Sequence, residues 1–334
     1  MLKKILPLLL CLALTLAACG PQDSANKTED SLTLAATTYP VYLFACEVTK
    51  GAVDTNVTLI INQSVSCLHD YTLSVQDMKV LEGADVVLLN GAGLENSMAD
   101  ALEASHTQQI DCSKGIELLA SSHDHDHDHS HGKEAEEVHA GEDHDHIEET
   151  HAAMETHTDL EGEADPHIWM DPMRACQMIE NLAHGLGELD PTNAALYEAN
   201  AQAAMEKVTA AYTGLQHQLD DLDCKDLITF HDGFTYFAQA FGLTILRSIE
   251  EEAGSEASAK DVMEILEEME IHHVPAIFTE TNGSTATAQV IQRENGTPIF
   301  SLDMLMSGQT EGVGIDTYIA GITANVMTIQ EAYT

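Results

Sequence analysis

The sequence is poor in positive charge and, beyond its first residues, in long apolar runs. Its 334 residues include 13 Lys and Arg against 56 Asp and Glu, so the formal net charge is −43 at pH 7. A protein that binds nucleic acid needs a basic face for the phosphates, so this balance excludes nucleic acid as a partner. After residue 31 no apolar segment is long enough to cross a bilayer, and we expect residues 32–334 to form a soluble body.

The N-terminus has the pattern of a secretory signal over residues 1–18, because Lys3 and Lys4 precede a short apolar stretch and small residues. The sequence Leu16-Ala17-Ala18-Cys19 is similar to a bacterial lipobox. We therefore expect Cys19 to be lipidated and residues 19–31 to tether an extracytoplasmic protein to the membrane, at the cell surface or in the periplasm. The alternative is an ordinary cleaved signal in which Cys19 has no role.

The sequence has seven cysteines, and five remain once Cys11 of the signal segment and Cys19 are set aside. An odd number of cysteines allows at most two disulfides within one molecule. We expect a Cys67–Cys112 disulfide, because both residues would lie in loops at strand ends on one side of a sheet. The alternative makes Cys67 a soft metal ligand.

Residues 122–165 combine ten histidines with sixteen acidic residues. Imidazole and carboxylate are the ligands that first-row divalent metals prefer. With few apolar side chains the tract cannot offset the entropy of ordering, so we predict a disordered loop over residues 122–164. The loop would gather zinc weakly or would be a dispensable acidic insertion, and in either case the specific site lies in its ordered flanks.

The remaining pattern alternates short β-branched runs with longer amphipathic ones, which predicts α/β lobes with parallel sheets. Predicted strands cover residues 32–37, 56–61, 85–89 and 108–111, and then 227–230, 244–249, 276–279 and 298–302. Residues 172–222 contain no strand-like run and predict helices, with Asp190 as N-cap and Pro191 as the first residue of the second one. We expect an N-terminal lobe over residues 32–171, a helical spine over 172–222 and a C-terminal lobe over 223–334.

Four side chains lie where ligands bind in such folds, beyond the carboxyl ends of parallel strands. His69 follows the second predicted strand, His167 lies where the first lobe meets the spine, and His231 follows the first strand of the second lobe. Asp303 follows the last strand. These residues would converge across one cleft between the lobes.

Three motifs carry a family resemblance: Leu-His-Asp-Tyr-Thr-Leu from residue 68, Asp-Pro-His-Ile-Trp-Met-Asp-Pro from residue 165, and Phe-His-Asp-Gly-Phe-Thr-Tyr-Phe-Ala from residue 230. With them the chain resembles the solute-binding lipoproteins of zinc and manganese ABC importers. The resemblance implies two Rossmann-like lobes joined by a long rigid helix, the fold of metal-type periplasmic binding proteins. It also implies metal ligation by His69, His167 and His231, with Asp303 as the carboxylate; water or another acid, of which Glu280 is the candidate, is the alternative fourth ligand.

The implied function is capture of Zn²⁺ and its delivery to an ABC permease for uptake, by a monomer. The sequence has no P-loop, so the ATPase would be a separate subunit. Three imidazoles and one oxygen suit tetrahedral Zn²⁺, whereas Mn²⁺ favours more oxygen ligands and is the alternative cargo. The same residues would also suit a zinc-binding adhesin, a metal buffer, or a hydrolase whose open metal position activates water. The sequence contains no His-Glu-x-x-His or Gly-x-Ser-x-Gly motif, so we do not expect an enzyme.

Acidic neighbours of the histidines are candidates for orienting the imidazoles through their second ring nitrogens. They are Asp70, Asp165 and Asp232. We expect Asp171 instead to cap a helix, and Trp169, the only tryptophan, to pack between the first lobe and the spine.

Overall fold

The computed structural model describes residues 31–61, 68, 71–121, 164–249 and 257–334. The predictions for the signal segment, Cys19, the tether, Cys67, His69, Asp70 and the histidine-rich tract therefore lie outside the described residues. Within the described residues, no helix is long and apolar enough to span a membrane.

The first lobe is a four-stranded parallel sheet with the order β2-β1-β3-β4. Its strands are β1 (Leu32–Ala36), β2 (Thr55–Leu59), β3 (Val86–Leu89) and β4 (Gln108–Asp111). The intervening helices are α1 (Tyr39–Val48), α2 (Val75–Gly83) and α3 (Ala99–Ser105), and a 3₁₀ turn, η1 (Asn96–Met98), precedes α3.

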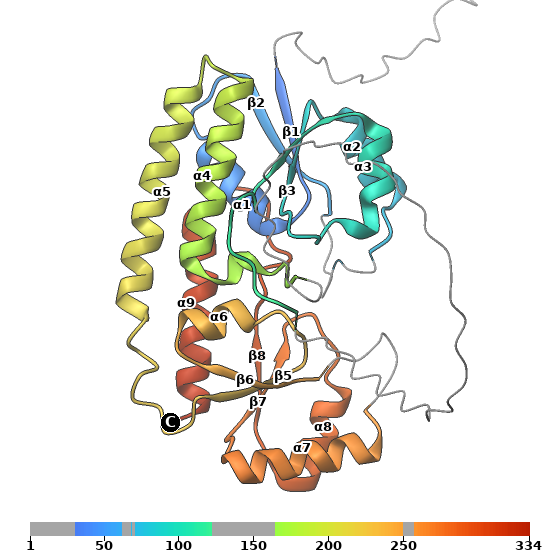
Figure 1. Cartoon of the computed structure of the whole chain (residues 1–334), viewed down its shortest axis with the longest axis vertical. Coiled ribbons are helices and arrows are strands. Elements are labelled where there is room, and N and C mark those ends of the chain that lie inside the picture. The colour runs from blue at the N-terminus through green and yellow to red at the C-terminus, as the bar shows by residue number, and fades with distance from the viewer. Residues whose placement is uncertain (1–30, 62–67, 69–70, 122–163, 250–256) are drawn as a thin grey trace, which may run out of the picture.

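The second lobe repeats this topology with the order β6-β5-β7-β8. Its strands are β5 (Asp226–Thr229), β6 (Thr244–Ser248), β7 (Ile277–Glu280) and β8 (Ile299–Leu302), and its helices are α6 (Thr235–Ala240), α7 (Ala259–His272) and α8 (Ala286–Asn295). Serine capping boxes start α2 and α7, as expected of Ser-x-x-Asp before an amphipathic run. The predicted pair of parallel α/β lobes is confirmed (Figure 1).

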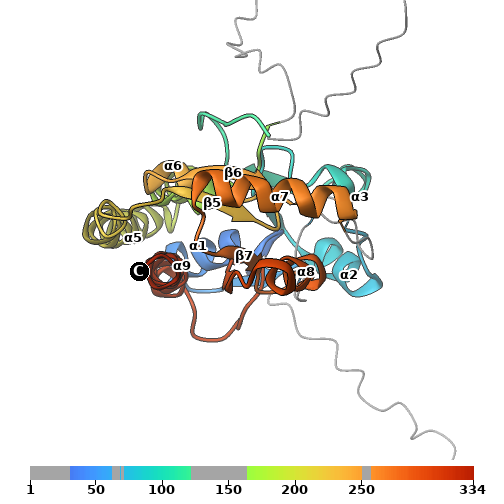
Figure 2. The ribbon, with the colours of Figure 1, turned by 90° about the horizontal axis from the view of Figure 1, so that it is seen from below.

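Three long helices connect the lobes, α4 (Pro172–Leu189), α5 (Ala194–Leu215) and α9 (Ile315–Ala332). A second 3₁₀ turn, η2 (Ile168–Met170), leads into α4. Figures 1 and 2 both place α5 and α9 along one side of the lobes, and α9 packs on α1 of the first lobe as well as on α5. The expected single helical spine is therefore incomplete, because the chain crosses between the lobes a second time through the segment that leads into α9.

The predicted start of the second spine helix was wrong by three residues. Asp190 caps the C-terminus of α4, and α5 begins at Ala194. The Asp190 carboxylate accepts hydrogen bonds from the backbone N–H groups of Thr192 and Asn193 and from the side chains of Asn193 and Tyr197. These bonds stabilise a turn between α4 and α5, so Pro191 lies in that turn.

Trp169 joins the first lobe to the C-terminal part of the chain. Its side chain is fully buried, and its indole N–H donates to the carbonyl of Met304 at 2.8 Å. The Tyr318 hydroxyl of α9 donates to the Trp169 carbonyl at 2.7 Å. The expected packing role of Trp169 is thus extended by two buried hydrogen bonds that reach across the molecule.

The expected Cys67–Cys112 disulfide stays a prediction, because Cys67 lies outside the described residues, among which Cys112 has a free thiol. The residue follows β4 and is fully buried, and its carbonyl accepts a hydrogen bond from the Asn181 amide of α4 at 2.9 Å. Burial raises the pKa of the Cys112 thiol well above its usual value, so the thiol stays protonated at neutral pH.

Glu95 is a buried acid at the carboxyl edge of the first sheet. It accepts hydrogen bonds from the Thr37 hydroxyl at 2.6 Å, the Asn90 N–H at 2.7 Å and the Gly91 N–H at 3.1 Å. Thr37 follows β1 and Asn90 follows β3, so the carboxyl group closes the crevice between these two strands. Burial raises the pKa of Glu95 to about 7, although the three hydrogen bonds act in the opposite direction.

The Glu95 carboxyl group should make stability depend on pH. An acid with a higher pKa in the folded state releases its proton on unfolding, so the free energy of unfolding falls as pH rises from about 4.5 to about 7. The expected loss is about 3 kcal/mol. Glu95→Gln cannot titrate and should lack this component in urea unfolding at pH 5 and pH 8. Glu103→Gln, at an exposed position on α3, is the control, and parallel pH profiles for wild type and Glu95→Gln would contradict the prediction.

Candidate metal centre

Two of the predicted histidines come together across the lobes. His167 precedes η2 and is 2% exposed, and His231 follows β5. Their Nε2 atoms lie 3.4 Å apart, and their rings stand at 89° with centroids 5.2 Å apart. One imidazole therefore comes from each lobe, with the same ring nitrogen of both directed at a common point.

Asp165 fixes the orientation of the His167 ring. Its Oδ1 lies 2.7 Å from His167 Nδ1 and also accepts the His167 backbone N–H at 2.9 Å. A carboxylate at Nδ1 selects the tautomer that carries the proton on Nδ1, which leaves the Nε2 lone pair for a metal. The expectation that Asp165 orients His167 is confirmed by this geometry.

Asp171 and Asp232, the other acids near the two histidines, contact backbone N–H groups and serine hydroxyls, respectively. Asp171 is the N-cap of α4, where it accepts the Met173 N–H at 2.7 Å, as expected. Asp232 lies beside His231, and its carboxylate contacts the hydroxyls of Ser121 and Ser248, each at 3.4 Å. Asp232 therefore bonds to a residue on each lobe.

Asp303 follows β8, where its backbone is held rigidly. Its N–H donates to the Asn325 side chain at 2.8 Å, and the Asn325 amide donates back to the Asp303 carbonyl at 2.7 Å. Asp303 Oδ1 accepts the Leu305 N–H at 2.7 Å, and burial raises the pKa of this carboxyl group. Glu280 ends β7, next to β5 in the sheet, and is 5% exposed.

The described residues do not form a complete coordination shell. Among them, no three His, Cys, Asp or Glu side chains are arranged to hold a metal ion together. Asp303 and Glu280 are thus not gathered with the histidine pair in this arrangement, and His69 lies outside the described residues. The structure provides two imidazole donors and the carboxylate that orients one of them.

Gly233 and Met304 lie beside the His231 ring of the His167–His231 pair. A Cβ at Gly233 would lie 2.2 Å from Met304 Cε, 2.8 Å from Met304 Sδ and 3.0 Å from His231 Cδ2. The thioether therefore fills the space that the missing side chain leaves, against the edge of the imidazole. Sequence reasoning missed Met304, and the only available signal was the glycine two residues after His231.

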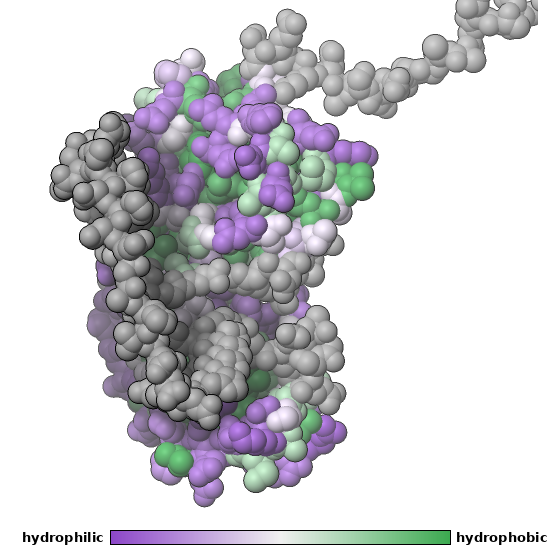
Figure 3. All heavy atoms as spheres, turned by 45° about the vertical axis from the view of Figure 1, so that its right-hand side comes forward, coloured by the Kyte–Doolittle hydropathy of each residue, from purple (hydrophilic) through white to green (hydrophobic). Residues whose placement is uncertain are grey.

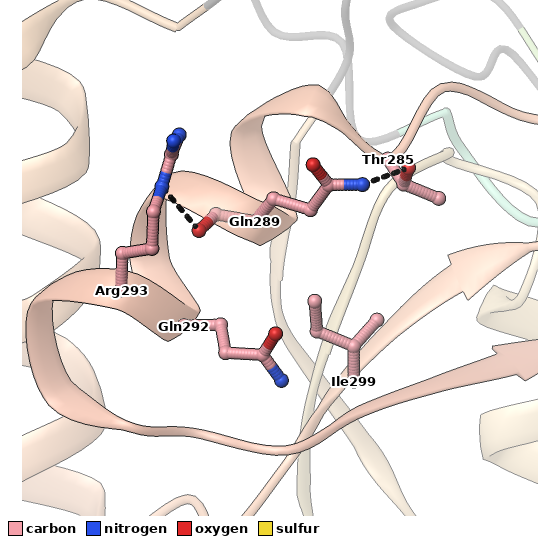
Figure 4. A pocket seen from close by; sticks show the side chains of 5 residues that line it. All are labelled: Thr285, Gln289, Gln292, Arg293 and Ile299. Atoms are coloured by element: carbon pink, nitrogen blue, oxygen red, sulfur yellow. Dashed lines mark hydrogen bonds between the residues drawn. The ribbon is translucent and has the colours of Figure 1, made fainter.

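A surface pocket of about 520 Å³ lies elsewhere in the second lobe. Figure 4 shows its lining residues at the start of and on α8 and at the start of β8, namely Thr285, Gln289, Gln292, Arg293 and Ile299. None of these residues carries an imidazole, thiolate or carboxylate, so the pocket does not suit a metal. Hydrophilic residues interspersed with apolar ones cover the face of both lobes drawn in Figure 3, as expected of a water-exposed surface.

Residues 34–332 match the family described as "Zinc-uptake complex component A periplasmic". Among curated relatives, the zinc-binding lipoprotein AdcA of Streptococcus pneumoniae serotype 4 is 28% identical over 99% of this chain. The chain spans 61% of that relative's length. The high-affinity zinc uptake system protein ZnuA of Bacillus subtilis is 27% identical, over 85% of this chain and 82% of its own length.

Solved structures with the same fold include proteins described with different metals and different functions. A crystal structure of ZnuA is 23% identical with a TM-score of 0.69, over 91% of this chain and all of that one. The laminin-binding protein Lmb of Streptococcus agalactiae, described as having adhesin and metal-transporting activity, is 23% identical with a TM-score of 0.70 over the same shares. FpvC of Pseudomonas aeruginosa with Mn²⁺ is 21% identical with a TM-score of 0.68, over 91% of this chain and 98% of that one.

Gly233→Ala should weaken metal binding. The added methyl group must displace the Met304 thioether, which is only 4% exposed and has little room to move, or push on the His231 ring. We expect Zn²⁺ affinity to fall on the order of tenfold and the free energy of unfolding by about 1–3 kcal/mol. Zinc titration against a competing chelator and urea unfolding would measure both effects.

Gly214→Ala on α5 is the matched control, because a Cβ there meets no atom within 4 Å. This variant should bind Zn²⁺ as the wild type does and gain up to about 1 kcal/mol of stability from helix propensity. Equal affinities for the two alanine variants would show that the Gly233 contact has no effect on the site.

Proposed function

The chain belongs to the family of periplasmic A components of zinc-uptake complexes, and from that membership we propose that it captures Zn²⁺ between its lobes and delivers the ion to a membrane permease. The family is a transport component and not an enzyme family. Because the chain spans only 61% of the AdcA relative, the cargo and the partners are part of the proposal.

The spacing of the two imidazoles is the observation that carries the proposal. Two Zn–N bonds of about 2.0–2.1 Å at a tetrahedral angle place their nitrogen atoms about 3.3–3.4 Å apart. The Nε2 atoms of His167 and His231 lie 3.4 Å apart. Asp165 at Nδ1 adds the outer hydrogen bond that zinc-bound histidines almost always have.

We assign the remaining two positions to His69 and Asp303. Three imidazoles and one carboxylate give the four-coordinate shell that Zn²⁺ favours, and Mn²⁺ would prefer more oxygen donors. Asp303 has one oxygen committed to the Leu305 N–H at 2.7 Å, so Oδ2 is the atom that would approach the ion. Glu280 is the fallback donor, at the end of a strand that neighbours β5.

The partners and the location follow from the same proposal. An ABC permease and a separate ATPase subunit would receive the ion, and the chain would act as a monomer. Lipidation at Cys19 would hold the protein at the outer face of the cell membrane. The histidine-rich tract would supply the site with weakly bound zinc. Capture of Mn²⁺, adhesion and metal buffering are the competing functions.

Deletion of residues 122–163 should leave one tight zinc site. Ala120 and Ala164 form an antiparallel bridge, so Ser121 followed by an inserted Asn-Gly can close a three-residue hairpin loop between them. This variant should bind one Zn²⁺ per chain in competition titrations and exclude Mn²⁺. His231→Ala in the same background should lose more than about a hundredfold in affinity, since outer hydrogen bonds alone are worth 10–100-fold.

The control for that substitution is His184→Ala, which removes an exposed imidazole of α4 paired with Glu188 at 3.6 Å. It should bind Zn²⁺ as its parent does. Loss of all tight binding on deletion of the tract would refute the inter-lobe site, and a preference for Mn²⁺ would change the cargo. Tight zinc binding without growth impairment of a null strain in chelated medium would favour adhesion or metal buffering.

Cys19→Ala tests the anchor. If Cys19 carries lipid, the substitution should prevent incorporation of labelled fatty acid and shift the protein from the membrane fraction of fractionated cells. Cys46→Ala, in α1 of the folded body, should incorporate label as the wild type does. Membrane association that is unaffected by Cys19→Ala would favour an ordinary cleaved signal.

A further inference from the structure

Tyr236 is a fully buried tyrosine of the second lobe whose hydroxyl makes both of its hydrogen bonds to the first lobe. It lies on α6, accepts the Leu119 N–H at 2.9 Å and donates to the Asp165 carbonyl at 2.8 Å. Neither bond is local, because the partners are 117 and 71 residues away in sequence.

The two partners belong to one small structure, which we call the clasp and define as Leu119, Ala120, Ala164 and Asp165. Ala120 and Ala164 form an antiparallel bridge, and the Asp165 N–H donates to the Leu119 carbonyl at 2.9 Å. The clasp therefore joins the two chain segments on either side of residues 122–163. Tyr236 binds both segments at once with a single oxygen atom.

The clasp leads directly to the histidine pair. Asp165 holds the His167 ring through Nδ1 at 2.7 Å, and His231 lies five residues before Tyr236 in the same motif. Tyr236 is thus connected to one imidazole through Asp165 and to the other through a short stretch of backbone. The position of the Tyr236 hydroxyl therefore affects the distance between Asp165, which holds the His167 ring, and the backbone that carries His231.

Arg174 of α4 holds the tyrosine ring from the other side. Its guanidinium carbon lies 4.9 Å from the centre of the Tyr236 ring, a cation–π distance. The same guanidinium donates to Gln239 of α6 at 3.0 Å, to Asp171 at 2.6 Å and to the Glu117 carbonyl at 3.1 Å. The ring is therefore fixed against the clasp by groups from α4, α6 and the segment before the clasp.

We propose that Tyr236 is a positioning residue for metal binding, which holds the clasp so that Asp165 presents His167 at the correct distance from His231. The inference rests on the proposed function and specifies how the protein prepares the site before the ion arrives. Without the hydroxyl, the part-buried Leu119 N–H and the buried Asp165 carbonyl each lose a partner, and Asp165 is free to shift. The two imidazoles would then have to be brought together by the ion itself, at a cost in affinity.

Tyr236→Phe removes only the hydroxyl and is the test. Tyr212→Phe is the matched control, because the Tyr212 hydroxyl is partly buried and donates to the Ala240 carbonyl at 2.7 Å without contacting the clasp. Both variants should be made in the full mature chain with residues 122–163 present. A chelator strong enough to strip weak sites would isolate the tight site during Zn²⁺ competition.

We expect Tyr236→Phe to lose about tenfold in Zn²⁺ affinity, the lower end of the range for outer hydrogen bonds, and Tyr212→Phe to lose none. Co²⁺ bound at the site should show altered visible absorption in Tyr236→Phe only, because the bands report ligand geometry. Combining Tyr236→Phe with Asp165→Asn should cost less than the product of the two single losses, since both act through His167.

The outcomes separate the two proposals. Equal affinities and equal Co²⁺ spectra for the two phenylalanine variants would overturn the role of Tyr236 and leave the proposed function standing. A lower affinity of Tyr236→Phe that only follows a lower melting temperature, with a wild-type Co²⁺ spectrum, would also overturn it. If the wild type bound no zinc tightly, the proposed function would fail and this inference with it.

Discussion

The close approach of two imidazoles from different lobes is the constraint on which the rest of the structure depends. With the Nδ1 proton of His167 directed at Asp165, its Nε2 is a hydrogen-bond acceptor. The facing Nε2 of His231, 3.4 Å away, must then carry a proton if the two atoms are not to repel. A cation bound at this point, as proposed, would take the place of that proton between the two Nε2 atoms, so the hydrogen-bonded pair already has the spacing that the ion would require.

The two lobes share a strand order, but the residues at the carboxyl ends of their central strands differ. Between β1 and β3 the crevice is closed by Glu95, whose buried carboxyl group accepts three hydrogen bonds from the strand ends. The corresponding edge of the second lobe, between β5 and β7, carries His231 and Glu280. The first lobe instead contributes His167 from a segment after its sheet, and Asn90 supports that segment by donating to the Pro166 carbonyl at 3.0 Å. The two lobes therefore do not contribute to the site from equivalent positions, because the crevice between β1 and β3 is filled by Glu95 and the one between β5 and β7 is lined by His231 and Glu280.

The fold could be predicted from sequence because it depends on local signals. Most strands are short runs rich in β-branched or other apolar residues, α2 and α7 begin at serine capping boxes, and the lobe topology follows from alternating elements. His231 could be predicted because it sits in a distinctive motif after β5, and His167 because it sits in a distinctive motif before α4. Tyr236 and Met304 could not, because their roles arise from contacts with residues far away in sequence. The start of α5 was missed because Asp190, a good N-cap, forms a turn with Asn193 and Tyr197 instead.

Wide hinge opening would be a costly route to release of the proposed metal, because the chain crosses between the lobes a second time. Residues 303–314 bind α1 through the hydroxyls of Tyr39 and Tyr42, which donate to the carbonyls of Gln309 and Thr310 at 2.8 and 2.7 Å. The Trp169 N–H holds the Met304 carbonyl at 2.8 Å in the same region. Parting the lobes would disturb these bonds together, of which the Trp169–Met304 bond is buried and the two tyrosine bonds are partly buried, and each broken bond costs about 0.5–1.5 kcal/mol. Local displacement of a ligand would break fewer contacts than rotation of a lobe, so these hydrogen bonds favour release through a movement confined to the site itself.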